Sequence, residues 1–229
     1  MITTNLKLKV LSKQSSYNRD YALAYLRQKE PLFNEYKKFF RNLLNKYDIV
    51  LKNETVLDLA AGVGVELKIL SEFEPKTLIW HDKMPRVYEV ARENLKNLNN
   101  IIFNLKDIMD TEGYKSNSIK LAICHSSLCY IGNDFLFFKE IKRILQTNGF
   151  FYGQNSSFNW YKNLSNKSLI NLLRVYFFDW PLYKFTGLRF FSFGPVSPGR
   201  LRFIFKKLNF KIPHFEEFDE GIRFLISKQ

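Results

Sequence analysis

The sequence predicts an α/β fold built as one domain around a mostly parallel sheet. Between residues 54 and 157, short β-branched runs alternate with stretches of helical periodicity, which is the pattern of βαβ units. The chain has 229 residues, a length that favours one domain. Hydrophobic residues make up 46% of it, which is enough for a packed core, so the composition excludes general disorder.

Five strands and three helices are expected in this central region. The expected strands are residues 56–59, 77–80, 101–104, 121–125 and 150–155. The expected helices are residues 65–73, 86–97 and 134–145. Residues 1–50 precede them with apolar positions spaced by three and four residues, which predicts amphipathic N-terminal helices, with Pro31 in a first turn or between two helices.

The end of the chain predicts a helix and an antiparallel hairpin. Ser197 is a typical N-cap and Pro198 a typical first helical residue, so a helix is expected from there to about Leu208. Two strands joined by a tight turn should follow, at residues 211–218 and 222–227.

Residues 159–200 interrupt the alternation of strands and helices. Aromatic residues are interleaved there with lysine and arginine, and Asp179 is the one acid of the segment. We interpret the segment as an insertion that caps the sheet. One domain over residues 1–229 is therefore expected to comprise N-terminal helices (1–50), a core (54–157), the cap insertion (159–200) and a terminal helix with its hairpin (201–229).

Charge and aromatic content indicate an anionic partner. Lysine and arginine number 35 against 22 acids, a formal net charge of +13, and 17% of the residues are aromatic. Such a charge favours nucleic acid, a membrane surface or an acidic small molecule. The stretch from Asn159 to Pro213 contains ten basic residues and one acid, Asp179. Most of the excess positive charge therefore lies in the cap and the helix that follows it.

Cysteine usage and hydropathy favour a cytoplasmic protein. Cys124 and Cys129 are too few for a disulfide framework, and no cluster of cysteine and histidine predicts a metal site. The N-terminus has no signal-peptide pattern. The longest apolar stretch, residues 169–180, contains charged residues and is too short to span a membrane. The sequence leaves the oligomeric state open.

The loop after the first expected strand carries the clearest functional signal. It reads Asp58-Leu-Ala60-Ala-Gly62-Val-Gly64, with small residues where a ligand would approach the backbone. A dinucleotide fingerprint would need glycine or alanine at position 67, which is leucine. A phosphate-binding loop would need lysine and a hydroxyl residue after Gly64. NAD, ATP and GTP are therefore not favoured.

The spacing Asp-x-Ala-x-Gly-x-Gly resembles the first motif of the class I S-adenosylmethionine-dependent methyltransferases, with Ala60 in place of the first glycine. Asp82 after the second strand resembles the family's ribose-binding acid, and Asp107-Ile108 after the third resembles its adenine contacts. Residues 140–151 resemble the family's conserved helix, turn and fifth strand. These motifs occur in the order that the family expects.

The resemblance implies S-adenosylmethionine as cofactor and a Rossmann-like, three-layer α/β/α sandwich. The sheet would have seven mostly parallel strands in the order 3-2-1-4-5-7-6, with an antiparallel C-terminal strand, N-terminal helices and a helical, aromatic cap insertion. Residues 54–157 become the cofactor-binding core. The residues implied to bind the cofactor are Asp58, Ala60, Gly62, Gly64, Asp82, Lys83, Met84, Asp107, Ile108, His125, Tyr17 and Tyr25.

Two of these cofactor residues come from a tyrosine stripe. Tyr17, Tyr21 and Tyr25 repeat at intervals of four, which places them on one face of a helix. In many members of the family that this sequence resembles, a tyrosine of this region closes over the cofactor carboxylate. Packing against the core would equally explain the stripe.

Catalytic candidates lie where the fourth and fifth strands end. His125 is a candidate general base or holds the methionine part of the cofactor; alternatively, its ring only packs in the cleft. Tyr130 is the second catalytic candidate. The expected substrate-binding residues are Tyr130, Asn155, Ser156, Trp160 and Tyr161, although the first three would also suit a purely structural role in their loops.

We expect methyl transfer to an oxygen or nitrogen of a small, anionic metabolite such as a sugar or a natural-product intermediate. Two alternatives stay open: an RNA methyltransferase that uses the basic aromatic cap, and a non-catalytic binding module on the same fold. Peripheral contact with anionic lipid also stays open. The stretch from His125 to Leu128 lacks the Asp-Pro-Pro-Tyr-like motif of base and amide methyltransferases, which disfavours those substrates.

Overall fold

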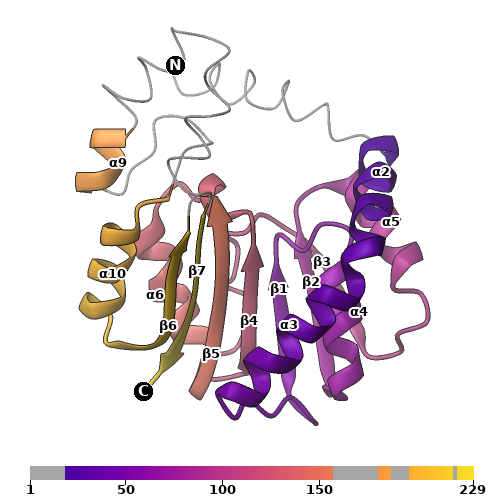
Figure 1. Cartoon of the computed structure of the whole chain (residues 1–229), viewed down its shortest axis with the longest axis horizontal. Coiled ribbons are helices and arrows are strands. Elements are labelled where there is room, and N and C mark those ends of the chain that lie inside the picture. The colour runs from indigo at the N-terminus through magenta and orange to yellow at the C-terminus, as the bar shows by residue number, and fades with distance from the viewer. Residues whose placement is uncertain (1–18, 157–179, 187–195, 219–220) are drawn as a thin grey trace, which may run out of the picture. The chain divides into compact units, whose positions relative to one another are not determined.

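A computed structural model describes residues 19–156, 180–186, 196–218 and 221–229 (Figure 1). Tyr17, Trp160 and Tyr161, most of the expected cap, and two residues of the last expected turn lie outside these ranges. The elements are α2 (Arg19–Lys29), η1 (Glu30–Leu32), α3 (Phe33–Lys46), β1 (Thr55–Leu59), α4 (Val65–Leu70), η2 (Ser71–Phe73), β2 (Thr77–Asp82), α5 (Pro85–Asn94), β3 (Ile101–Leu105), β4 (Ile119–His125), η3 (Leu128–Tyr130), α6 (Asp134–Ile144), β5 (Leu145–Ser156), α9 (Trp180–Thr186), α10 (Pro198–Lys207), β6 (Phe210–Phe218) and β7 (Gly221–Lys228).

The seven strands form one sheet in the order β3-β2-β1-β4-β5-β7-β6, as the resemblance implies. The pairs β2–β3, β1–β4 and β4–β5 are parallel. β7 runs antiparallel to both β5 and β6, which makes it the antiparallel C-terminal strand that was expected. The expected fold class is confirmed.

One strand boundary differs from the expectation. The sequence predicts a turn at residues 146–149 and a strand from Phe150, but β5 begins at Leu145. A register shift absorbs the extra residues, because Ile119 pairs with Leu145 whereas Leu121 pairs with Phe150. Gly149 fits inside this irregularity because a Cβ there would lie 2.8 Å from a backbone oxygen. Helix, irregularity and strand therefore follow one another without a separate loop.

The chain divides into two compact units, and each is described by itself. The first comprises described residues 19–54 and 60–107. Its helix α3 buries Phe40, Leu43 and Leu44, the apolar face that the three-and-four spacing predicts. On β2, the buried Trp80 ring packs against Tyr88 and Phe103 at centroid distances of 5.6 and 5.7 Å.

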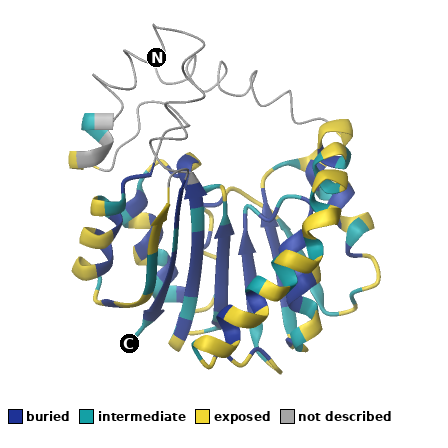
Figure 2. Ribbon diagram, in the orientation of Figure 1, coloured by how far each residue is buried: buried dark blue, intermediate teal, exposed yellow. Residues whose placement is uncertain are grey.

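The second unit comprises residues 55–59 and the described residues from 108 onward. Its strands β1, β4, β5 and β7 are largely buried, whereas β6 is largely exposed, and its helices α6 and α10 expose one side (Figure 2). Phe138 of α6 and Phe205 of α10 lie 4.9 Å apart and both contact the Phe224 ring on β7. Gly153 permits this packing, since a Cβ there would lie 2.4 Å from the tip of Phe224.

Helices α6 and α10 of this unit begin at side-chain caps. Asn133 caps α6 by accepting a hydrogen bond from the Leu136 amide, at 3.0 Å. Ser197 caps α10 and Pro198 opens it, as the sequence predicts. Between the two helix starts, Arg200 donates two hydrogen bonds to Asp134, at 2.7 and 2.8 Å, and both side chains are buried.

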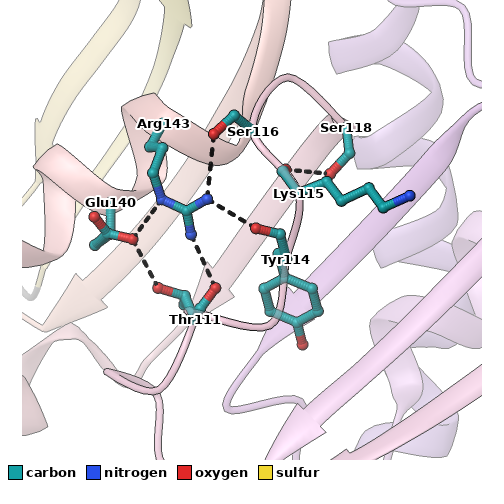
Figure 3. A network of polar contacts seen from close by, with 7 residues as sticks. All are labelled: Thr111, Tyr114, Lys115, Ser116, Ser118, Glu140 and Arg143. Carbon is teal, nitrogen blue, oxygen red and sulfur yellow. Dashed lines mark hydrogen bonds and ion pairs between the residues drawn. The ribbon is translucent and has the colours of Figure 1, made fainter.

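Arg143, which lies in the stretch 140–151 that resembles the family's helix, turn and fifth strand, has a structural role in this unit (Figure 3). Arg143 on α6 donates to Glu140 at 2.8 Å and to the backbone carbonyls of Tyr114 and Thr111, at 2.8 and 3.0 Å. One arginine thereby fixes the segment between β3 and β4 to α6. Among the described residues, no helix is long and apolar enough to cross a membrane.

Candidate functional site

The loop after β1 turns through three left-handed residues. Ala60, Gly62 and Gly64 have φ angles of 57°, 53° and 79°. Glycine adopts this conformation without strain, whereas alanine does not. The position at which the sequence departs from the family motif is therefore one whose backbone still has the geometry of glycine.

Replacing Ala60 with glycine is expected to stabilise the chain. Relief of the left-handed strain outweighs the extra chain entropy of glycine, by about 0.5–1 kcal/mol. Urea unfolding of both proteins measures the difference. A loss of stability would show that the loop does not hold this backbone conformation in solution.

Gly62 is held at both of its peptide groups and is open at its α-carbon. Its amide donates to Oδ2 of Asp82 at 3.0 Å, and its carbonyl accepts from the indole nitrogen of Trp80 at 2.8 Å. A Cβ at this position would meet nothing within 4 Å. The backbone is thus fixed from one side and accessible from the other, as a loop that binds a ligand through close approach requires.

Gly64 serves packing instead. A Cβ there would lie 2.5 Å from Cδ1 of Leu95, a buried side chain. The neighbouring carbonyl of Val63 accepts from Asn94 at 2.8 Å, so the end of α5 also holds the loop. Glycine is therefore required at positions 62 and 64 for different reasons: access for a ligand at Gly62, and close packing against Leu95 at Gly64.

A matched pair of alanine substitutions distinguishes the packing role of Gly64 from the ligand-access role of Gly62. Gly64→Ala is expected to cost about 2–4 kcal/mol of stability, from backbone strain and overpacking against Leu95. Gly62→Ala should cost only about 1 kcal/mol of strain but weaken ligand binding about tenfold or more. Unfolding curves and calorimetry on both variants measure the two effects. Equal stability losses would contradict the distinction.

Asp82, the last residue of β2, organises the same loop. It is buried, its Oδ2 accepts from Gly62, and its Oδ1 accepts from the Met84 amide at 2.9 Å. Burial raises the pKa of this carboxyl above its ordinary value, and the donated backbone hydrogen bonds oppose the rise. An ionised carboxylate has about four acceptor sites, so it keeps acceptor capacity beyond the backbone amides of Gly62, Lys83 and Met84.

The segment after β3 is tied to β2. His81 is fully buried, and its Nε2 lies 2.8 Å from the Asp107 carbonyl, which requires the proton on that nitrogen. The Asp107 carboxylate is half exposed and pairs with Lys83 at 3.0 Å. His81 thus positions the segment that contains the expected adenine contacts, of which Ile108 is buried.

Tyr25 of α2 lies in an aromatic cluster with a cation. Lys29 donates to the Tyr36 hydroxyl at 2.8 Å and lies 5.2 and 5.0 Å from the Tyr25 and Tyr36 ring centroids. Burial raises the pKa of Tyr25 to about 12, Lys29 lowers it and Glu66 raises it further. Like an ordinary tyrosine, Tyr25 is protonated at neutral pH, so its hydroxyl can donate a hydrogen bond to a carboxylate.

In the second unit, the expected catalytic residues follow the ends of β4 and β5. Ser126, directly after His125, has φ 61° and donates its amide to the Gln154 carbonyl at 2.7 Å. Asn155 is buried and its Oδ1 accepts from the Cys129 amide at 3.4 Å, which holds η3 to β5. Tyr130 of η3 is 42% exposed.

The described structure brings the expected site residues into two groups. The first unit contains Ala60, Gly62, Gly64, Asp82, Lys83, Met84, Asp107 and Tyr25; the second contains Asp58, Ile108, His125, Tyr130, Asn155 and the backbone of Ser156. Sequence reasoning missed Trp80, whose indole fixes the loop. A tryptophan near the end of a strand gives no sign of a bond to a loop 18 residues earlier.

Comparison with known proteins identifies similar chains. Residues 51–174, more than half of the sequence, match the family model described as a methyltransferase domain. No curated protein matches the chain significantly. A putative S-adenosyl-L-methionine-dependent methyltransferase from Methanococcus maripaludis is 21% identical, with a TM-score of 0.64 over 93% of this chain and 94% of that chain.

Two further solved structures share the fold. A putative methyltransferase from Haloferax volcanii, solved in complex with the Trm112 methyltransferase activator, is 14% identical, with a TM-score of 0.64 over 92% of this chain and 97% of that one. Geranyl diphosphate C-methyltransferase from Streptomyces coelicolor, solved with Mg²⁺, geranyl-S-thiolodiphosphate and S-adenosyl-L-homocysteine, is 9% identical, with a TM-score of 0.60 over 80% and 73%.

Proposed function

The chain belongs to the class I S-adenosylmethionine-dependent methyltransferases, and on that premise we propose that it methylates an oxygen or nitrogen of a small, anionic metabolite. The observation that carries the proposal is the pairing of Asp82 with the Gly62 amide. The buried carboxylate keeps acceptor capacity, and it lies next to Gly62. A Cβ at Gly62 would meet no atom within 4 Å, so the backbone there is open to a ligand. This combination fits the ribose and the close approach of S-adenosylmethionine.

The cofactor supplies an activated methyl group on a sulfonium, so the chain mainly has to hold and align the reactants. In the proposal, Asp82 accepts the ribose hydroxyls, Asp107 and Ile108 contact the adenine, and Tyr25 donates to the methionine carboxylate. The remaining proposed cofactor contacts are Asp58, Ala60, Gly64, Lys83, Met84 and Tyr17.

The acceptor decides what His125 has to do. An alcohol needs a general base within hydrogen-bond reach, whereas an unprotonated amine needs none. We assign this base role to His125 and substrate contacts to Tyr130 and Asn155, followed along the chain by Ser156, Trp160 and Tyr161. A His125→Gln variant that keeps full activity would indicate an amine acceptor.

The net charge supports an anionic acceptor, and one structural neighbour favours a small molecule over RNA. The net charge of +13 favours an anion of either kind. One structural neighbour was solved with geranyl-S-thiolodiphosphate, a small anion, on the same fold. An RNA substrate would instead give RNA binding that falls steeply with salt concentration, which filter binding on the full chain measures.

Calorimetry with S-adenosylmethionine and S-adenosylhomocysteine tests the proposed function. Both should bind the full chain at one site. If neither binds to protein that is folded by circular dichroism, the enzyme proposal fails and a non-catalytic module remains. Tritium transfer from labelled cofactor to pools of small anions or to RNA then identifies the acceptor class.

A further inference from the structure

A row of polar side chains crosses four strands of the second unit. His125 on β4 pairs with Gln154 on β5, Gln154 with Arg223 on β7, and Arg223 with Glu216 on β6. Directly opposed residues of neighbouring strands project from the same face of a sheet. Four residues separated by up to 98 positions in sequence therefore stand side by side.

Side-chain contacts support this shared face. Nε of Arg223 lies 3.4 Å from Oε2 of Glu216. The hydroxyl of Tyr152, two residues before Gln154, donates to its Oε1 at 2.8 Å. His214, two residues before Glu216, lies 3.5 Å from the same carboxylate oxygen. Polar residues thus occupy all four positions of the row, and Tyr152 and His214 of the next row contact two of them, Gln154 and Glu216.

The row lies at the functional end of these strands. His125 is the last residue of β4, and Gln154 lies two residues before the end of β5. β7 runs in the opposite direction and starts at Gly221, opposite Ser156, so Arg223 lies near the same end. Open α/β sheets bind ligands beyond the carboxyl ends of their parallel strands (β4 and β5 in Figure 1).

Arg223 is an unusual residue for its surroundings. The next row on the same face contains Tyr152 and Leu225, which are 1% and 0% exposed, whereas the Arg223 side chain is 30% exposed. Partial burial of a guanidinium costs desolvation energy that a good ion pair must offset. The 3.4 Å contact with Glu216 is longer than the 2.7–2.9 Å typical of charge-assisted hydrogen bonds.

The contacts of Arg223 orient the side chain for a ligand. Its guanidinium lies 5.0 Å from the centroid of the Phe218 ring, and Glu216 lies at its Nε edge. A guanidinium carries five N–H donors in a planar fork that matches carboxylate and phosphate groups. An arginine held in this way at a ligand-binding edge is preorganised for an oxyanion.

We propose that Arg223 binds an oxyanion group, carboxylate or phosphate, of the methyl-accepting substrate, and that Gln154 positions the substrate between Arg223 and His125. The inference rests on the proposed function. Two strand spacings separate His125 from Arg223, roughly 10 Å between their Cα atoms. The substrate therefore carries its acidic group and its accepting atom about one sugar or aromatic ring apart.

Nuclear magnetic resonance of arginine side chains tests this assignment. The ¹⁵N-labelled full chain, saturated with S-adenosylhomocysteine, is titrated with benzoate, phenyl phosphate and uncharged benzamide. The Arg223 Nε–H signal, identified by its absence from an Arg223→Lys variant, should shift saturably with at least one of the two anions and not with benzamide. The anion that shifts it distinguishes a carboxylate from a phosphate site.

Arg202 provides a matched control on α10. It lies 3.7 Å from the centroid of the Phe215 ring and 3.1 Å from Glu217, so it too is held by an aromatic ring and an acid. Its signal should not respond. Arg223→Gln should weaken binding of the effective anion about ten- to a hundredfold and leave S-adenosylhomocysteine affinity unchanged, whereas Arg202→Gln should change neither.

Different results overturn different statements. An Arg223 signal that neither anion moves, or that benzamide moves equally, overturns the assignment while cofactor binding stands. Unchanged anion affinity in Arg223→Gln does the same. If S-adenosylhomocysteine does not bind the folded chain, the proposed function fails and this inference fails with it.

Discussion

Replacing Asp82 with alanine is expected to weaken S-adenosylmethionine binding about a hundredfold or more. The change removes the carboxylate proposed to accept the ribose hydroxyls. It also removes the acceptors that hold the Gly62 and Met84 amides, so the loop loses its fixed geometry. Calorimetry on wild type and variant measures the loss, and circular dichroism verifies that the variant folds.

Two other acids calibrate this prediction. Asp107→Ala should weaken binding less, because that carboxylate is half exposed and pairs with Lys83. Glu93→Ala should have no effect, since Glu93 is exposed on α5 and pairs with Lys96. An Asp82→Ala protein with wild-type affinity would mean that the cofactor site has been assigned to the wrong residues.

The raised pKa of Asp82 also predicts the direction in which cofactor affinity changes with pH. Only the ionised carboxylate accepts from both backbone amides and from the ribose, so cofactor affinity falls as the pH falls through this pKa. Because burial raises the pKa, the loss begins at a higher pH than for an exposed aspartate. The stability of the ligand-free protein has the opposite pH dependence. Because the pKa of Asp82 is higher in the folded than in the unfolded chain, the free energy of unfolding falls as the pH rises between the two pKa values.

Replacing Arg200 with methionine is expected to cost about 3–5 kcal/mol of stability, because the change leaves Asp134 buried and charged. The two side chains are only 9% and 5% exposed and share two short hydrogen bonds. The double variant Arg200→Met with Asp134→Leu should regain most of that loss. Urea unfolding of the wild type, both single variants and the double variant measures the coupling.

Arg202→Met is the matched control for this cycle. It removes the ion pair between Arg202 of the same helix and Glu217 of β6. Both side chains are about half exposed, and such pairs contribute at most about 1 kcal/mol. If Arg200→Met cost no more than Arg202→Met, the pair between α6 and α10 would not be desolvated in solution.

Local patterns in the sequence predicted the strands and the loop after β1, and the resemblance to the methyltransferase family implied the sheet order. Ser197 and Pro198 predicted the start of α10 because capping is a local property. Asp82 was predicted through its resemblance to a family motif. The early start of β5 was not predictable, since Leu145 joins the sheet only through its pairing with Ile119.

Long-range pairing explains what sequence reasoning missed. In the sequence, Arg223 is an ordinary basic residue of an expected strand. Only the strand register places it beside Gln154 and Glu216. Likewise, the sequence could not reveal that the His81 ring bonds to the Asp107 carbonyl. Such contacts depend on how strands align, and no local pattern encodes that alignment.

The bond between the Trp80 indole and the Gly62 carbonyl gives the chain an optical reporter. Indole emission responds to the hydrogen bonding and polarity around its nitrogen, and this ring is fully buried. The sequence has two other tryptophans, Trp160 and Trp180, which phenylalanine can replace to isolate the signal of Trp80. Loop movement upon ligand binding would then register as a change in the intensity or wavelength of Trp80 fluorescence.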